Sequence, residues 1–386
     1  MLYRKLGRTG VDVSILGFGC MRLPLIKSDQ ALPAGNAAID EPEAARILHW
    51  AIDNGVNYID TAYPYHGGNS ELFLGRALQG GYRQKVYLAT KLPGRLIKSR
   101  KDMDRILNEQ LEKLQTGFID FYLVQAVSES TWPGLVDNNV FEFLDNALAD
   151  GRIRYAGFSF HSELPLFKDV VNAYDWSFCQ IQYNYLDENF QAGKAGLEYA
   201  VERDLGVVIM EPLRGGKLAS DVPPGVEQIW RRAKTKRSPA EWALRFLWDH
   251  PGISVVLSGM SLMEQVVENV RIAGQALPNT LNTEEKELIE EAKKYYLSRT
   301  KVNCTRCRYC MPCPVGVNIP GCLSLLDNLH IFGEVKTNRM FYKMYMSSDE
   351  EKASNCAECG ECEKKCPQNI PIRLLLKEAV KAFEGK

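Results

Sequence analysis

Residues 43–62 of this 386-residue chain read EAARILHWAIDNGVNYIDTA, a helix-like segment followed directly by a strand-like one. Over Glu43–Asn54 the apolar residues recur at the three- and four-residue spacing of an amphipathic helix, and Asn57–Ala62 is a short apolar run of strand length. Similar pairs repeat along the chain as far as Ser258. The strand-like runs are Val13–Phe18, Asn57–Ala62, Val86–Thr90, Phe118–Val124, Arg154–Ser159, Phe178–Tyr183, Val207–Met210 and Ile253–Ser258.

This alternation predicts an α/β protein with a (β/α)8 TIM barrel, because strands joined by helices lie parallel with right-handed crossovers. A doubly wound open sheet is the alternative. We disfavour it because no Gly-x-Gly-x-x-Gly follows the first strand. We expect the barrel over residues 1–282 and a connecting helix over 283–300. In addition to the eight strand–helix pairs, we expect a hairpin of Leu2–Leu6 with Val11–Ile15 and an extra helix at Gly225–Arg237.

The overall composition is that of a folded globular protein, with 45% hydrophobic and 25% charged residues. The formal net charge of −1 argues against a general attraction to nucleic acid or to an anionic membrane. No run approaches the ~20 apolar residues that span a bilayer. The first residues lack the apolar core of a secretory signal. We therefore expect a cytoplasmic protein that acts on a small-molecule substrate.

The cysteines are concentrated in the last part of the chain. Of the 11 cysteines, only Cys20 and Cys179 precede Cys304. In a cytosolic protein such crowding argues for metal binding rather than for disulfides. It predicts a second, small domain over residues 301–386. The two motifs there are C-x2-C-x2-C-x2-C-P from Cys304 and C-x2-C-x2-C-x3-C-P from Cys356, and each is followed by Asn-Ile-Pro and an apolar run. The tail is thus an internal duplication.

This spacing is typical of a bacterial-ferredoxin-like domain with two [4Fe–4S] clusters, in which three closely spaced cysteines ligate one cluster and the fourth reaches the other. The first motif is one residue short before its fourth cysteine, which leaves that ligand's assignment open. Zinc sites are the alternative, but they usually use separated Cys-x2-Cys pairs. The expected ligands are Cys304, Cys307, Cys310 and Cys366 for one cluster and Cys356, Cys359, Cys362 and Cys313 for the other.

Three ionisable residues follow consecutive strands of the predicted barrel, where the chemistry of such barrels lies. Asp60 and Tyr65 follow the second strand, and Lys91 follows the third. A phenol with a pKa near ~10 is a poor acid at neutral pH, but a nearby ammonium lowers that pKa. We therefore expect Tyr65 to protonate a developing alkoxide. The alternative is an ion pair and a Tyr-Pro-Tyr loop that only close the barrel.

The chain resembles the aldo-keto reductase family from Tyr3 to about Ile272. The resemblance implies that Tyr65 is the proton donor and that Lys91 and Asp60 tune it. It further implies that a nicotinamide cofactor lies across the strand ends, with its carboxamide held by Ser159 and Gln180. The segments that carry the resemblance are Tyr3–Gly10, Gly17–Arg22, Asp60–Tyr65, Asn69–Glu71, Thr90–Lys91, Gly157–Ser159 and Gln180–Asn184.

The sequence departs from the family at the end of the fourth strand, where Gln125 occupies the position of the family's histidine. Glutamine donates a hydrogen bond to a carbonyl oxygen, but it cannot carry positive charge or relay a proton. Either carbonyl reduction is slowed or the substrate is not the usual ketone or aldehyde. His66 and His161 are alternative sources of an imidazole. The other interpretation is that each is an ordinary histidine in a loop or at the rim, with no part in the reaction.

The resemblance places the rest of the cofactor against the segments after strands seven and eight. The segment after strand eight has no Lys or Arg before Arg271 and contains Glu264 and Glu268. Since a phosphate beside carboxylates is unfavourable, we expect NAD(H) rather than NADP(H). The implied cofactor residues are Met210, Pro212, Leu213, Gly215, Ser258, Gly259, Ser261, Gln265 and Asn269.

Three functions are compatible with these two parts, because hydride carries two electrons, an iron–sulfur cluster accepts one, and no flavin fingerprint is evident. The first is an NAD(P)(H)-dependent oxidoreductase that interconverts a carbonyl and an alcohol. The second is an electron-transfer oxidoreductase, in which the clusters pass single electrons between a protein partner and a substrate in the barrel. The third is a cofactor-binding redox sensor or interaction protein with little turnover.

Overall fold

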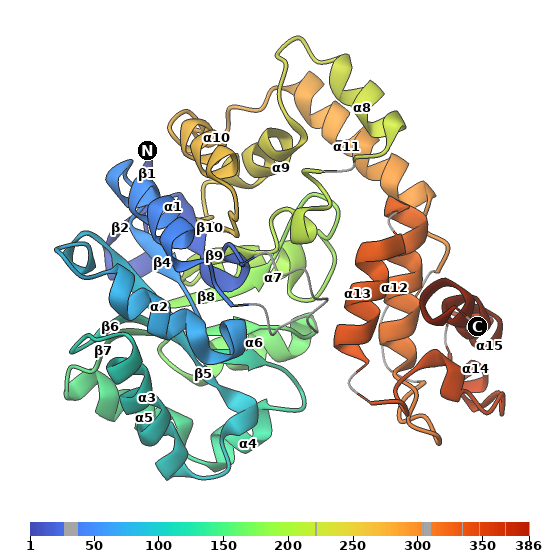
Figure 1. Cartoon of the computed structure of the whole chain (residues 1–386), viewed down its shortest axis with the longest axis horizontal. Helices are drawn as coiled ribbons and strands as arrows, with labels where there is room; N and C mark the ends of the chain where they lie inside the picture. Colours follow the sequence, from blue (N-terminus) through green and yellow to red (C-terminus); the bar gives the residue numbers. More distant parts are fainter. Residues whose placement is uncertain are drawn as a thin grey trace. The chain divides into compact units, whose positions relative to one another are not determined.

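The computed structural model describes residues 1–26, 38–220, 222–302, 304, 310–333, 335–346, 348–366 and 368–385. Eight parallel strands close into a barrel in the order β10-β3-β4-β5-β6-β7-β8-β9, which confirms the predicted fold (Figure 1). Each predicted run overlaps one of them. The strands are β3 (Leu16–Gly19), β4 (Tyr58–Asp60), β5 (Tyr87–Pro93), β6 (Ile119–Val127), β7 (Ile153–Phe160), β8 (Phe178–Gln182), β9 (Gly206–Met210) and β10 (Val255–Ser258).

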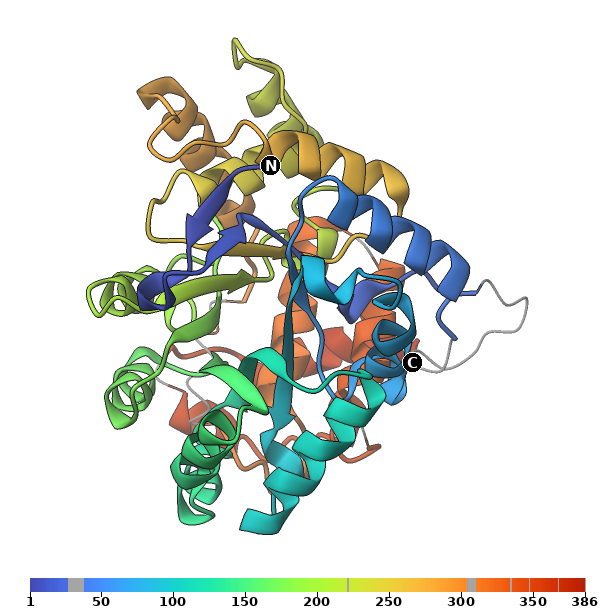
Figure 2. The ribbon, with the colours of Figure 1, turned by 90° about the vertical axis from the view of Figure 1, so that its left-hand side faces the viewer.

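The amino end of the barrel is closed by the predicted hairpin, β1 (Tyr3–Lys5) and β2 (Asp12–Ser14), drawn in dark blue in Figure 2. The predicted first barrel run is therefore wrong at its start, because Val13 belongs to this hairpin. The backbone N–H of Arg8 donates to the Asp204 carbonyl at 2.8 Å. Gly7 has a φ of 50°, and a Cβ there would lie 2.1 Å from the backbone nitrogen of Gly206, so only glycine fits this contact.

The barrel interior is a packed core rather than a channel. The ring of Phe121 lies at its centre, with centroid distances of 5.4 Å to Tyr58, 5.3 Å to Tyr155 and 5.3 Å to Phe178. Since side chains fill the inside, the carboxyl ends of the strands are left for chemistry. The buried interior residues are Leu6, Val13, Tyr58, Ala89, Phe121, Leu123, Phe178, Val208, Val255 and Leu257.

Helices surround the barrel and pack their apolar faces on the outside of the strands. Helix α1 buries Ala44, Ile47, Leu48 and Ala51, the residues at helical spacing in the sequence. Helix α9 begins after Ser238, whose hydroxyl accepts from the Glu241 backbone N–H at 3.0 Å. These helices are α1 (Glu41–Asp53), α2 (Asn69–Ala77), α3 (Arg100–Lys113), α4 (Trp132–Asp137), α5 (Val140–Ala149), α6 (Leu164–Ala173), α7 (Gly193–Val201), α9 (Pro239–Trp248) and α10 (Met263–Ala273).

The chain divides into two compact units, residues 1–220 with 237–285 and residues 221–236 with 286–386. The predicted extra helix and the predicted helix after the last strand are present as α8 and α11. The predicted domain borders at 282 and 300 stay predictions. The helices outside the first unit, or crossing its border, are α8 (Pro224–Arg231), α11 (Thr283–Ser298), α12 (Ile319–Phe332), α13 (Val335–Tyr345), α14 (Glu361–Lys365) and α15 (Ile372–Ala379).

The duplicated Asn-Ile-Pro segments each lead into a helix of the second unit. Asn318 caps α12 by accepting from the Gly321 backbone N–H at 3.2 Å, and α15 starts directly after Pro371. Both helices bury leucines in one apolar core, including Leu326 and Leu376. Of the helices that the structure describes, none has the length and apolar character needed to cross a membrane.

We predict that Phe121→Ala lowers the free energy of unfolding by about 3–5 kcal/mol, because it leaves a cavity among the four aromatic rings of Tyr58, Tyr87, Tyr155 and Phe178. Urea denaturation followed by circular dichroism measures the loss. The matched control is Leu72→Ala on the exposed side of α2, which should lose far less. Equal losses in the two variants would contradict a packed barrel interior.

Candidate active site

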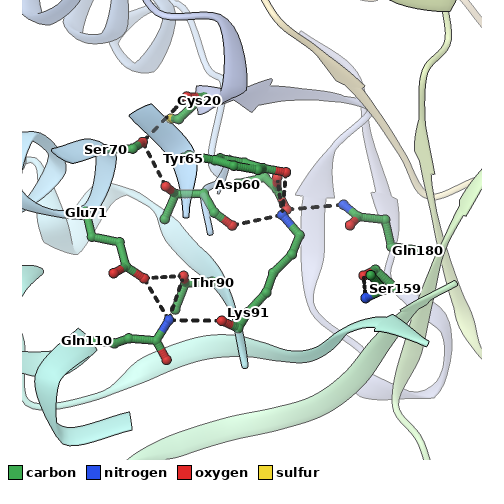
Figure 3. Close-up of polar contacts among 12 residues, drawn as sticks. Cys20, Asp60, Tyr65, Ser70, Glu71, Thr90, Lys91, Gln110, Ser159 and Gln180 are labelled. Atoms are coloured by element: carbon green, nitrogen blue, oxygen red, sulfur yellow. Dashed lines mark hydrogen bonds and ion pairs between the residues drawn. The ribbon is translucent and has the colours of Figure 1, made fainter. Parts of the chain in front are cut away.

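Asp60, Tyr65 and Lys91 meet at the carboxyl ends of β4 and β5, as the sequence predicts (Figure 3). Asp60 is the last residue of β4, Tyr65 begins the 3-10 turn that follows, and Lys91 lies in β5. The Lys91 Nζ donates to Asp60 Oδ1 at 2.7 Å, to the Thr61 carbonyl at 2.8 Å and to Tyr65 Oη at 3.3 Å. The three residues therefore form one hydrogen-bonded group.

This arrangement leaves the phenol proton of Tyr65 available to a group other than Lys91. An ammonium has three N–H donors, and the three contacts of Lys91 use all of them. Because Tyr65 Oη accepts from Lys91, its own O–H is left to donate to another group. The second oxygen of Asp60 accepts from Gln180 Nε2 at 3.1 Å. The carboxylate is thus held from both sides.

The protonation of the group follows from its burial. Burial raises the pKa of Tyr65 above its ordinary value, and the opposing effect of the Lys91 ammonium is smaller. The sequence-based expectation that Lys91 leaves this phenol with a lowered pKa is therefore wrong in its net direction. Burial also disfavours the ammonium of Lys91, but Asp60 and Tyr65 attract its charge, and its pKa is raised. The lysine is charged and the tyrosine is protonated at neutral pH.

A second buried polar group, which sequence reasoning did not identify, fixes the backbone of β5 beneath the trio. The Glu71 carboxylate on α2 accepts from Thr90 Oγ1 at 2.7 Å and from Gln110 Nε2 at 2.7 Å. Gln110 Nε2 also donates to the Lys91 carbonyl at 3.0 Å. Figure 3 shows this group directly beside the Lys91 side chain. It positions Lys91 through the main chain. Its only sequence signal is the Asn69–Glu71 motif.

The end of β6 is irregular at the position of the expected histidine. Gln125 pairs with Pro93 of β5, and the next residue, Ala126, has a φ of 53° at a break in the strand register. The backbone N–H of Ala126 donates to Ser159 Oγ at 2.8 Å. Gln125 is therefore at a strand end on the same rim as Lys91. Its role there stays a prediction.

The two histidines considered as substitutes lie in loops of the rim. His66 accepts from the Leu23 backbone N–H at 3.4 Å, and burial lowers its pKa. His161 directly follows β7, and burial lowers its pKa to about 4. Both rings are therefore neutral at neutral pH, so neither supplies the charged imidazole that Gln125 lacks.

The residues predicted to hold the rest of the cofactor lie at the ends of the adjacent strands β9 and β10, in the loops after them, or in α10. Met210 ends β9, Pro212 and Leu213 follow it, Gly215 lies in the 3-10 turn Arg214–Gly216, and Ser258 ends β10. The polar groups after β10 bond one another. Asn269 Nδ2 donates to Ser258 Oγ at 3.1 Å, and Gln265 Oε1 accepts from the Ser261 backbone N–H at 3.0 Å.

The structure adds a cation that the linear sequence does not place near α10. Arg46 on α1 lies within electrostatic range of Glu264 at the start of α10. The segment after strand eight therefore has a positive charge near it, although its own sequence has no Lys or Arg before Arg271. The preference for NAD(H) stays a prediction.

The cysteines of the second unit offer the donor chemistry that an iron–sulfur cluster needs. The Glu358 backbone N–H donates to Cys356 Sγ at 3.4 Å. Within the described ranges, which omit Cys307, no group of three or more candidate ligands is gathered for metal binding, so the pairing of cysteines with clusters stays a prediction. The motif cysteines that the structure describes are Cys304, Cys310, Cys313, Cys356, Cys359, Cys362 and Cys366.

Comparison with known families agrees with both parts of the chain. The Aldo/keto reductase family profile matches residues 16–294, and the profile of a 4Fe-4S dicluster domain matches residues 303–370. The chain therefore belongs to the aldo/keto reductase family. It is an oxidoreductase of that type with a carboxyl-terminal 4Fe-4S dicluster domain, as its sequence motifs predict.

Individual relatives share most of the chain. Uncharacterized oxidoreductase YqkF of Bacillus subtilis is 27% identical over 334 residues, which are 78% of this chain and 97% of that protein. L-galactose dehydrogenase of Arabidopsis thaliana is 27% identical over 290 residues, covering 69% and 86% of the two chains. The structure of the aldo-keto reductase AKR11C1 from Bacillus halodurans, in its holo form, superimposes with a TM-score of 0.62 at 28% identity and covers 76% of this chain and 96% of its own.

We predict that Lys91→Met lowers kcat for carbonyl reduction roughly 100-fold. Without the ammonium the phenol is a weaker acid, because Lys91 lowers the pKa of Tyr65. Alcohol oxidation, which needs the phenolate, should lose even more, because the phenolate becomes less available as the pKa of Tyr65 rises further. Stopped-flow assays of both directions at fixed pH values between 6 and about 10 measure the two losses.

The control for Lys91→Met is Lys85→Met, which removes an exposed lysine paired with Asp53 at 2.9 Å. Its pH profile should match that of the unchanged protein. A Lys91→Met variant that keeps the rates of both reduction and oxidation would show that Lys91 does not act on Tyr65.

Proposed function

We propose that the barrel interconverts a carbonyl and an alcohol on a small molecule by hydride transfer from or to a nicotinamide dinucleotide, with Tyr65 as proton donor. The observation that carries the proposal is the contact of Lys91 Nζ with both Asp60 Oδ1 and Tyr65 Oη. It gives a phenol whose proton points away from its charged neighbour. Family membership and the dehydrogenase name of one relative support the same chemistry.

The residues at the strand ends fit a bound nicotinamide dinucleotide. The cofactor supplies a hydride when bound. Ser159 Oγ accepts from Ala126, which leaves its O–H able to donate, and Gln180 uses its Nε2 on Asp60, which leaves its carbonyl oxygen able to accept. One donor and one acceptor on neighbouring strands match the two ends of a carboxamide. Glycines at 215 and 259 keep side chains out of the loops where the pyrophosphate is expected.

Tyr65 transfers the proton of the reaction, supported by Lys91 and Asp60. In the direction of reduction, Tyr65 donates its O–H to the substrate oxygen as charge develops there, and Lys91 stabilises the resulting phenolate. Asp60 keeps Lys91 charged and in place. In the direction of oxidation the same phenolate takes the proton back. Gln125, at the rim, is proposed to donate a neutral hydrogen bond to the substrate oxygen.

The second unit favours an additional electron-transfer role, because the dicluster profile covers residues 303–370. We infer two [4Fe–4S] clusters on the eight motif cysteines, with the crossed ligand pattern that the spacing predicts. The clusters then exchange single electrons with a protein partner. Whether those electrons reach the barrel substrate is the second candidate function. It is separable by experiment from the first.

The test of the barrel function is NADH and NADPH oxidation with a panel of aldehydes and ketones under anaerobic conditions. Turnover is expected with at least one carbonyl, and Tyr65→Phe should lower kcat by about 100-fold or more while the Kd for cofactor changes little. Turnover that Tyr65→Phe leaves intact would overturn Tyr65 as the donor. Cofactor binding without turnover would favour the redox-sensor function instead.

The position of Gln125 is tested separately. We predict that Gln125→His raises kcat for carbonyl reduction, because an imidazole relays protons and carries charge as an amide cannot. The matched control is Gln182→His, at the end of β8. An unchanged rate in both variants would place Gln125 outside the reaction.

The cluster assignment is tested by iron, sulfide and zinc analysis of anaerobically purified protein, together with EPR after reduction. About eight irons and eight sulfides per chain are expected for two cubanes. Bleaching of the cluster absorbance by NADH would support electron transfer between the units. A colourless protein with zinc would overturn the iron–sulfur assignment.

A further inference from the structure

Three loops of the first unit meet around the side chain of Arg22. Arg22 ends the 3-10 turn Cys20–Arg22 directly after β3, and β10 lies between β3 and β9 in the barrel. The loops after β9, β10 and β3 are therefore neighbours at the carboxyl rim. Gly19 confirms how closely they approach, because a Cβ there would lie 3.4 Å from the Ser258 carbonyl oxygen.

Two glycines of the expected cofactor loops make room for this arginine. A Cβ on Gly215 would lie 3.0 Å from Arg22 Nη2 and 3.8 Å from Glu211 Oε2, and a Cβ on Gly259 would lie 3.1 to 3.3 Å from three carbons of the Arg22 side chain. The guanidinium thus lies against the loop after β9, and its aliphatic part lies against the loop after β10. Any larger residue at either position would have to displace it.

Arg22 forms no ion pair within the described part of the chain, although the Glu211 carboxylate borders the same position at Gly215. Arg22 is half-buried. The other arginine in these loops, Arg214, is paired with Asp187 at 3.5 Å. A half-buried guanidinium between two glycine-containing loops is suited to a phosphate, because its planar donors match phosphate oxygens and the glycines open the backbone N–H groups.

We propose that Arg22 binds the pyrophosphate of the dinucleotide cofactor and holds the loops after β9 and β10 against it. This rests on the proposed function and adds one residue from outside those two loops. The positive charge comes from the loop after β3, far away in the sequence. Arg22 is a binding residue in this proposal and takes no part in proton transfer.

The first test measures binding to the full-length protein without turnover. NADH fluorescence titration gives the Kd, and ADP-ribose and adenosine are used as competitors, since ADP-ribose carries the pyrophosphate and adenosine does not. Arg22→Gln should raise the Kd for NADH and for ADP-ribose by about tenfold or more and leave that for adenosine unchanged. Arg22→Lys should fall between, because lysine keeps the charge but not the two parallel donors.

The matched control is Arg203→Gln, which removes an arginine that precedes β9 and so lies at the opposite end of the barrel. Its affinities should not change. Equal loss of adenosine and ADP-ribose affinity in Arg22→Gln would overturn the proposal, because the arginine would then act through the fold. An unchanged Kd in Arg22→Gln would also overturn it. If the unaltered protein binds neither NADH nor NADPH, the proposed function itself fails.

The second test moves Arg22 without removing its charge. Gly259 does not have a left-handed φ, so its backbone accepts alanine, but the new Cβ would press on the Arg22 side chain. Gly259→Ala should weaken ADP-ribose binding, and it should have little further effect in the Arg22→Gln background. Fully additive effects of the two substitutions would show that Gly259 and Arg22 act independently and would overturn the contact as the basis of binding.

Discussion

The site depends on one buried ammonium. Lys91 Nζ makes three hydrogen bonds, to Asp60, to the Thr61 carbonyl and to Tyr65. A charge removed from water is unfavourable unless it is paired and fully hydrogen-bonded, and here every donor has a partner. Because the ammonium donates to the phenol oxygen, the phenol O–H is left to donate to another group. The availability of that O–H therefore follows from how a single positive charge is hydrogen-bonded.

The rigidity of that contact comes from packing on two sides. Below the rim, Phe121 and its four aromatic neighbours fill the barrel, and this close packing restrains the strands. Beside the rim, Gln110 bonds both Glu71 and the main chain of Lys91, which ties β5 to α2 and α3. A reacting phenol must be held to within a fraction of an ångström, and these two supports act on the strand that carries its partner.

The two parts of the protein belong to different kinds of redox domain. The barrel belongs to the aldo/keto reductase family, and the carboxyl-terminal part is a 4Fe-4S dicluster domain. A hydride carries a pair of electrons, whereas a cubane accepts one. In the proposed function, the trio at the barrel rim transfers the proton and the cysteine-rich unit exchanges single electrons.

Local sequence patterns were sufficient for the barrel, its hairpin and the meeting of Asp60, Tyr65 and Lys91, because periodicity marks each strand and parallel strands bring their ends to one rim. The cysteine spacing was sufficient for the dicluster domain for the same local reason. Only the tertiary structure showed the raised pKa of Tyr65, since burial is a property of all surrounding elements. It alone brought Arg22 to the loops after β9 and β10, because contacts between residues two hundred positions apart leave no periodic trace in the chain.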